Sequence, residues 1–150
     1  MALEVGVVRA SYVIAARRQP DMARRFFGLL FARHPAARAL FVDVEPRQRE
    51  ARFKHTLEVL LAHLHDGEWL DVTAHGLGAM YLAKGATRET YAWATECLLL
   101  VLADAAGHAW TPHVAQMWLT ALSEVTELFI EGAAEADTLV DVAAPTPLAG

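Results

Sequence analysis

Apolar side chains recur every three or four positions along most of the chain, which is the period of amphipathic α-helices. The clearest stripe runs from Val114 to Phe129, and Thr111 followed by Pro112 supplies the N-cap and the first residue of that helix. Thr87 marks the start of a second long helix, and Gly107 marks its end. No stretch alternates apolar and polar residues with period two over the length of a strand. The pattern therefore predicts an all-α fold.

Shorter helices are expected in the first half of the chain, because prolines and glycines interrupt the apolar stripes there. The stripes cover residues 3–17, 21–34, 36–41, 53–64 and 69–84. The last fourteen residues contain two prolines and a terminal glycine with little apolar periodicity, which predicts a mobile tail. The expected organisation is one domain over residues 1–136, followed by a tail over residues 137–150.

Composition narrows the classes of function. The formal net charge of -5 over 150 residues gives no electrostatic reason to expect a nucleic acid as partner. The one cysteine, Cys97, cannot form an internal disulfide, so the fold is compatible with a reducing compartment. The N-terminal segment lacks the charge order of a secretory signal, and no apolar run reaches the length of a membrane span. We expect a soluble cytoplasmic protein that binds neither nucleic acid nor a membrane.

Four stretches of the sequence are similar to a known family. They read RRFFGLLFARHPAARALF, TLEVLLAHLHDGEWLDVTAHGLGAM, GATRETYAWATECLLLVLADAAG and WLTALSEVTELFIEG. Their spacing and aromatic placement resemble those of bacterial single-domain globins related to the flavohaemoglobins, and the similarity covers nearly all of residues 3–135. The resemblance implies a globin fold of about seven to eight helices, with haem b as the cofactor. No reductase domain follows in the sequence, so a separate reductase is the expected source of electrons.

The resemblance also implies which residues line the distal side of a haem pocket. Phe41 matches the phenylalanine that wedges against the haem, and Phe53 matches the apolar distal neighbour. Phe27 stands where the family has a tyrosine, so the hydroxyl that would hydrogen-bond bound oxygen is missing. The distal polar residue falls on Arg49, or on Gln48 if the preceding loop holds one extra residue. An arginine there suits a small anion such as peroxide, nitrite or a carboxylate, because its guanidinium presents a fork of donors.

The proximal position departs from the family pattern. The histidine that ligates the iron falls on Tyr81, which precedes the family tyrosine at Tyr91 by ten residues. Shifting the match by one residue gives Met80 or Leu82, and neither restores a histidine. The glutamate that completes the family's proximal network falls on Ala133. A phenolate ligand from Tyr81 would stabilise ferric iron, which disfavours reversible carriage of oxygen.

His75 is the second candidate for the iron ligand. It precedes Tyr81 by six residues, which places it about 120° away around an ideal helix. It would reach a haem only if the segment around Gly76 and Gly78 were rotated or partly unwound, and glycines make that easier.

Two hypotheses about function follow. In the first, the protein is a haem-binding globin whose pocket contains Tyr81 as the iron ligand. It would handle or sense a small diatomic molecule or an oxidant, or perform peroxidase-like oxidative chemistry, rather than carry oxygen. In the second, the protein is a haem-free module with a globin fold that has a regulatory or small-ligand-binding role. Homodimerisation through the exposed faces of the last two long helices stays open in both.

Overall fold

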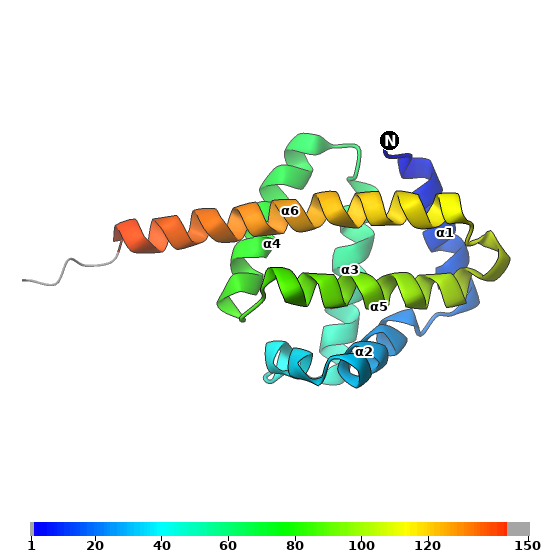
Figure 1. The fold of residues 1–150 in the computed structure, drawn as a ribbon, viewed down its shortest axis with the longest axis horizontal. Helices are drawn as coiled ribbons and strands as arrows, with labels where there is room; N and C mark the ends of the chain where they lie inside the picture. The colour runs from blue at the N-terminus through cyan, green and yellow to red at the C-terminus, as the bar shows by residue number, and fades with distance from the viewer. Residues whose placement is uncertain (1, 144–150) are drawn as a thin grey trace, which may run out of the picture.

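The chain folds into a set of helices that cross one another around a common core (Figure 1). The computed structural model describes residues 2–143, and this part of the chain contains no strand. The all-α class is therefore confirmed, and the order of long and short helices is that of a globin-like fold. The elements are α1 (Val5–Arg18), α2 (Met22–Arg33), η1 (Pro35–Phe41), α3 (Pro46–Ala62), α4 (Gly67–Ala83), α5 (Arg88–Ala106), η2 (Gly107–Ala109) and α6 (Pro112–Ala143), where η denotes a 3₁₀-helix.

The predicted helix starts and stops are confirmed by hydrogen bonds and backbone geometry. Thr87 and Thr90 form a capping box at the start of α5, in which each side chain accepts from the backbone N–H of the other, at 3.3 and 2.8 Å. The hydroxyl of Thr111 accepts from the N–H of Val114 at 3.2 Å. Gly107, which follows α5, has φ of +58°, a conformation that glycine adopts without steric cost.

Several boundaries differ from the sequence prediction. α3 begins at Pro46 rather than at Phe53, because Pro46 fits the first position of a helix, where no N–H donor is needed. α4 begins at Gly67 rather than at Trp69, because the Asp66 side chain caps the helix by accepting from the N–H of Trp69 at 3.2 Å. α6 continues through Ala143, so residues 137–143 of the predicted tail are helical. This segment has neither glycine nor proline. Each residue that is added to an existing helix forms one more backbone hydrogen bond, so the helix continues through such a segment. The rest of the predicted tail, residues 144–150, lies outside the described residues.

The core joins α1 and α6 through a buried polar contact. Trp118 of α6 is fully buried, and its indole Nε1 donates to the hydroxyl oxygen of Ser11 on α1 at 2.8 Å. The hydroxyl of Ser11 in turn lies 2.9 Å from the carbonyl oxygens of both Val7 and Val8, to which it can donate. A buried indole N–H needs such an acceptor, so this contact specifies how the two helices meet.

α4 and α6 approach so closely that two glycines are required where they cross. An ideal Cβ on Gly78 would lie 2.0 Å from the carbonyl oxygen of Phe129, and one on Gly132 would lie 2.2 Å from the carbonyl oxygen of His75. The backbones of the two helices are therefore in direct contact, at Gly78 of α4 and at Gly132 of α6. Figure 1 shows α4 crossing behind the middle of α6, which continues past it. This crossing positions the segment that carries His75 and Tyr81.

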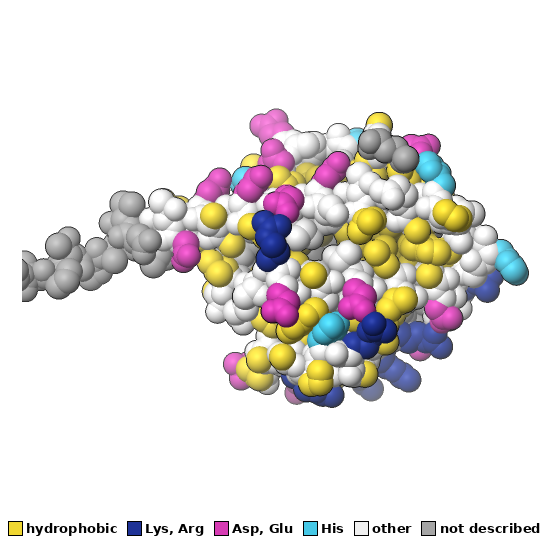
Figure 2. Space-filling view, viewed as in Figure 1, with side chains coloured by type: hydrophobic (Ala, Val, Ile, Leu, Met, Phe, Trp, Pro, Cys, Tyr) yellow, Lys and Arg dark blue, Asp and Glu magenta, His cyan; other side chains and the backbone are white. Residues whose placement is uncertain are grey.

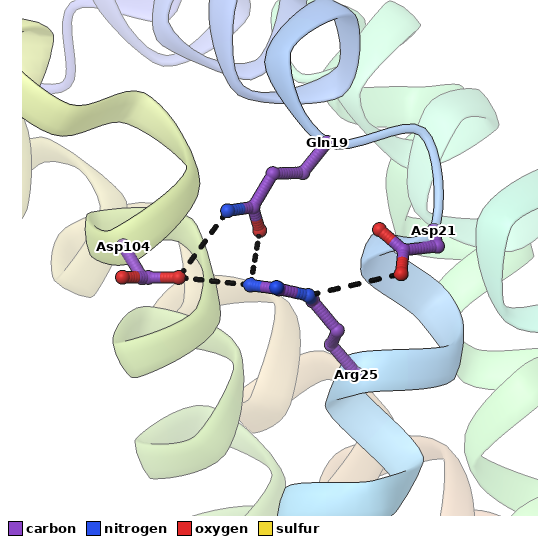
Figure 3. Close-up of polar contacts among 4 residues, drawn as sticks. All are labelled: Gln19, Asp21, Arg25 and Asp104. Atoms are coloured by element: carbon purple, nitrogen blue, oxygen red, sulfur yellow. Dashed lines mark hydrogen bonds and ion pairs between the residues drawn. The ribbon is translucent and has the colours of Figure 1, made fainter.

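A polar network fixes the corner between α1 and α2 against α5 (Figure 3). Arg25 Nη1 donates to Gln19 Oε1 at 2.7 Å and to Asp104 Oδ2 at 2.9 Å, and Arg25 Nε lies 3.8 Å from Asp21 Oδ2. Gln19 Nε2 donates to the same oxygen of Asp104 at 3.3 Å. Exposed ion pairs stabilise a fold only slightly. The network nevertheless links the ends of two helices to a third, and α2 also carries Phe27.

Charge is segregated along the chain and over the surface. Eleven of the thirteen lysines and arginines precede residue 55, whereas thirteen of the eighteen acidic residues follow it. Figure 2 shows basic side chains along the edge of the molecule where α2 lies, and acidic side chains over α6. A small anion would therefore be attracted to the side formed by α2, η1 and the start of α3. Within residues 2–143, no helix has both the length and the apolar character that crossing a membrane would require.

Candidate functional site

The phenylalanines that the resemblance assigns to the pocket lie together in the structure. Phe27 on α2 is buried, and its ring centroid lies 5.1 Å from that of Phe41 and 5.5 Å from that of Phe53. Phe53 also stacks on Phe26 at 4.2 Å, and Phe31 packs beside Phe27 at 5.9 Å. We call these five rings from α2, η1 and α3 the phenylalanine cluster. Its edge-to-face contacts are the arrangement that aromatic rings favour.

Arg49 of α3 covers one side of the phenylalanine cluster. Its guanidinium carbon lies 4.8 Å from the ring centroid of Phe31 and 5.4 Å from that of Phe27. Arg38 of η1 places its own guanidinium carbon 4.7 Å from the centroid of Phe31. Gln48, the alternative distal residue, is exposed. Of the two candidates, Arg49 is therefore the one that faces the cluster.

The Nε atom of Arg49 is buried and has no hydrogen-bond partner within residues 2–143. The ion pairs of this part of the chain involve the arginines Arg25, Arg33 and Arg88, and they include neither Arg38 nor Arg49. An unpaired guanidinium donor that is shielded from water is costly unless a ligand or a water molecule accepts from it. An acceptor placed beside this atom would therefore satisfy a donor that residues 2–143 leave unpaired.

Tyr81 belongs to a second aromatic group, formed by side chains of α4, α5 and α6. Its ring centroid lies 5.5 Å from that of Phe129 on α6 and 6.5 Å from that of Tyr91 on α5. Burial raises the pKa of the Tyr81 phenol, and a side-chain hydrogen bond with Thr56 of α3 opposes that shift. The neighbouring Met80 is 46% exposed, whereas Tyr81 and Leu82 are both half-buried.

The hydroxyl of Tyr91 is buried without a hydrogen-bond partner in the described part of the chain. Burial and the nearby Tyr81 raise the pKa of Tyr91 to about 12. Its ring stacks on Phe129 at 5.5 Å. The two tyrosines are thus brought together as predicted, and both are neutral phenols at neutral pH.

His75 faces α6 rather than the phenylalanine cluster. Its Nε2 lies 3.1 Å from Glu131 Oε2, and its Nδ1 lies 3.5 Å from Glu135 Oε2. Ala133, where the family network has a glutamate, is followed two residues later by Glu135 and preceded by Glu131. Both ring nitrogens of His75 are therefore turned to carboxylates on the outside of the α4–α6 crossing.

The environment of Tyr81 does not favour the ionised form that an iron ligand requires. An iron ligated by Tyr81 needs a phenolate, whereas burial favours the neutral phenol, and the side-chain hydrogen bond with Thr56 opposes that effect only in part. The contact with Thr56 also links α4 to α3. A hollow of about 90 Å³ is lined by Phe53 together with residues of α1 and α5, and one of about 260 Å³ lies between α2 and α5. The assignment of Tyr81 or His75 as an iron ligand stays a prediction.

Sequence reasoning missed several residues that complete these groups. Arg38 and Phe31 flank Arg49, while Thr56 and Phe129 flank Tyr81. Phe129 was recognisable as part of the apolar stripe of α6, and Phe31 lies within the stretch that resembles the second globin helix. Nothing in the sequence distinguishes Arg38 or Thr56 from other polar residues, because their roles depend on which helix packs beside them.

The fold and the two aromatic groups define an all-α protein with a globin-like order of helices. No family model matches the chain, and no curated protein matches it either. The similarity to bacterial globins therefore stands on the sequence stretches and on the helix order alone.

Proposed function

We propose that this protein is a haem-free, globin-like module that binds a small anion through Arg49. The observation that carries the proposal is the buried Nε atom of Arg49, which has no partner within residues 2–143. A guanidinium donates two parallel hydrogen bonds to a carboxylate or an oxyanion, so a small anion would satisfy this atom and its neighbour at once. Nitrite, phosphate and small carboxylates have suitable acceptor geometry.

Three features support an anion rather than a cation or an apolar ligand at this place. Arg38 and Arg49 both lie against the ring of Phe31, at 4.7 and 4.8 Å, so two positive charges are held near one another. The ring attracts both guanidinium groups through its π electrons, which helps to order them without neutralising them. Most basic residues of the chain also belong to the segment that forms this side.

The haem-free part of the proposal is supported by the environment of Tyr81. The phenol is kept neutral by burial, and it interacts with Thr56 and Phe129 instead of with a positive charge that would favour a phenolate. His75, the other candidate ligand, is engaged by Glu131 and Glu135. A regulatory or small-ligand-binding role requires no iron, and it accounts for the loss of the distal hydroxyl at Phe27.

The absorption spectrum of protein produced with haem supplied tests whether haem is bound. We expect no stoichiometric Soret band after gel filtration removes loosely associated haem. A stoichiometric band that is lost on Tyr81→Phe would contradict the haem-free proposal and support the phenolate ligand. A band that survives Tyr81→Phe but is lost on His75→Ala would contradict it equally and assign the iron to His75.

Anion binding is tested separately, by calorimetric titration and by the shift in Tm with nitrite, phosphate and acetate at constant ionic strength. A ligand present at about a hundred times its Kd stabilises the fold by about 2.7 kcal/mol. We expect at least one of these anions to bind, and Arg49→Gln to abolish its effect. Arg47→Gln is the matched control, since Arg47 lies in the same turns of α3 and is exposed. The proposal fails if none of the three anions binds, or if both variants respond like the unmodified protein.

A further inference from the structure

Three potential metal ligands meet where the end of α2 packs against α5, away from Arg49 and from both tyrosines. They are His34, which follows α2, and the neighbouring residues Glu96 and Cys97 of α5. One ligand atom from each, a ring nitrogen, a carboxylate oxygen and the thiol sulfur, all lie within 4.8 Å of one another. We propose that His34, Glu96 and Cys97 bind one Zn²⁺ ion.

The donor set and its spacing suit zinc. Zn²⁺ binds imidazole nitrogen, thiolate sulfur and carboxylate oxygen at about 2.0 to 2.3 Å, so ligand atoms in a tetrahedral site lie about 3.5 Å apart. His34 Nε2 and Glu96 Oε2 are 2.9 Å apart, and the sulfur of Cys97 lies within 4.8 Å of a ring nitrogen of His34 and of a carboxylate oxygen of Glu96. Shifts of about one ångström in the positions of the ligand atoms would bring all three to the separations of a tetrahedral zinc site.

Neighbouring side chains already orient two of the three ligands. The imidazole of His34 stacks on Trp93 with ring centroids 4.8 Å apart and an angle of 10° between the planes. Arg33 donates to Glu96 Oε1, which leaves Oε2 directed at His34. Metal sites typically have such an outer layer, in which a ligand's second atom is hydrogen-bonded and its orientation is thereby fixed.

Two of the three proposed ligands are partly exposed to solvent, so a metal ion can reach the site. Cys97 is fully buried, whereas the side chains of His34 and Glu96 are 23% and 38% exposed. A metal ion can approach from the side of His34 and Glu96 and reach the sulfur beneath them. Three protein ligands leave the fourth tetrahedral position for a water molecule.

Zn²⁺ binding requires each of the three ligand atoms to be free of its proton. Burial, together with the charge of Glu96, raises the pKa of the Cys97 thiol, so the metal-free protein holds S–H there. Zn²⁺ forms a bond to the sulfur and the thiol proton is released to solvent. The hydrogen bond to His34 lowers the pKa of Glu96, which is therefore already a carboxylate. His34 would bind the metal through the lone pair of Nε2, with the ring proton on Nδ1.

Cobalt(II) is the probe for this site, because it occupies tetrahedral zinc sites and gives visible and near-ultraviolet bands that zinc lacks. Reduced full-length protein is titrated with Co²⁺ alone. We expect one equivalent to bind, with tetrahedral ligand-field bands and a thiolate-to-cobalt charge-transfer band, and added Zn²⁺ to remove both. Cys97→Ser is expected to abolish the charge-transfer band, and Glu96→Gln and His34→Gln to weaken Co²⁺ binding by about ten- to a hundred-fold.

His63→Gln is the matched control, since His63 also stacks on a tryptophan, Trp69, with centroids 3.7 Å apart, and its Nδ1 lies 2.9 Å from the carbonyl oxygen of Val59. This variant should bind Co²⁺ as the unmodified protein does. Glu96→Gln and His34→Gln leave the buried thiol in place, so they test the site even if Cys97→Ser fails to fold. Absence of the charge-transfer band in the unmodified protein, or equal Co²⁺ affinity of His34→Gln and His63→Gln, would overturn the proposal.

Discussion

Gly78 of α4 lies directly against the backbone of Phe129 on α6, so that an ideal Cβ at Gly78 would sit 2.0 Å from the carbonyl oxygen of Phe129. No side chain can fit between the two helices at this point. The ring of Phe129 meanwhile contacts both Tyr81 and Tyr91. The lack of a side chain at Gly78 therefore lets α4 approach α6 closely enough for Tyr81 to contact Phe129.

Gly78→Ala should reduce the free energy of unfolding by about 3 kcal/mol, because the added methyl group meets backbone that cannot rotate away. Denaturant unfolding followed by circular dichroism measures the change. Gly76→Ala is the control in the same helix, since a Cβ there meets nothing within 4 Å. It should stabilise the protein by about 1 kcal/mol through helix propensity. Similar effects of the two substitutions would contradict the close crossing of α4 and α6.

Ser11→Ala should reduce the free energy of unfolding by about 1 to 3 kcal/mol, because it leaves the buried Nε1 of Trp118 without its acceptor. Chemical denaturation monitored by tryptophan fluorescence provides the measurement. Ser123→Ala alters an exposed serine of α6 and should change stability by less than about 0.5 kcal/mol. If Ser11→Ala is equally neutral, the hydrogen bond between α1 and α6 contributes nothing to the fold.

Tyr91→Phe and Tyr12→Phe should differ in their effect on stability. The hydroxyl of Tyr91 is buried with no partner within residues 2–143, so its removal should leave the free energy of unfolding unchanged or raise it by about 1 kcal/mol. The hydroxyl of Tyr12 donates to Glu58 Oε1 at 3.0 Å, so its removal should lower stability by about 1 kcal/mol. The free energies of unfolding of both variants, measured by thermal and denaturant unfolding, are compared with that of the unmodified protein. A loss of stability in Tyr91→Phe would show that its hydroxyl is satisfied by a group other than those described.

Stability should decline at alkaline pH because the fold favours neutral tyrosines. Burial raises the pKa of Tyr81 and of Tyr12, and it raises the pKa of Tyr91 to about 12, whereas an unfolded tyrosine titrates near a pKa of about 10. A pKa that is higher in the folded state contributes stability below about pH 10, and that contribution is lost as the pH rises through the folded values.

The tyrosinate absorbance of native and of denatured protein measures this difference directly. The chain has three tyrosines, all of which carry a raised pKa. Native protein should therefore show little tyrosinate at a pH where the denatured protein is half ionised. A native titration that coincides with the denatured one would mean that the phenols of Tyr81 and Tyr91 are exposed to water.

The positions of the candidate residues could be predicted only in part. Phe27, Phe41 and Phe53 were expected to line one pocket, and they form one cluster. Tyr81 was expected to face inward, and it lies half-buried beside Tyr91. The partners of these residues could not be foreseen. His34 and Glu96 are separated by 62 positions in the chain, and no periodic pattern relates residues at such a distance.

The sequence by itself determined the helices and several of their ends. Thr87, Thr111 and Gly107 act on backbone groups within one turn of themselves, so their effects can be read locally. Only the tertiary structure decided which surfaces meet. The neutral state of Tyr81, the unpaired Nε of Arg49 and the turning of His75 toward α6 all depend on burial and on neighbours contributed by other helices. Those neighbours are set by packing, including the glycine contacts between α4 and α6, and packing is a property of the whole fold.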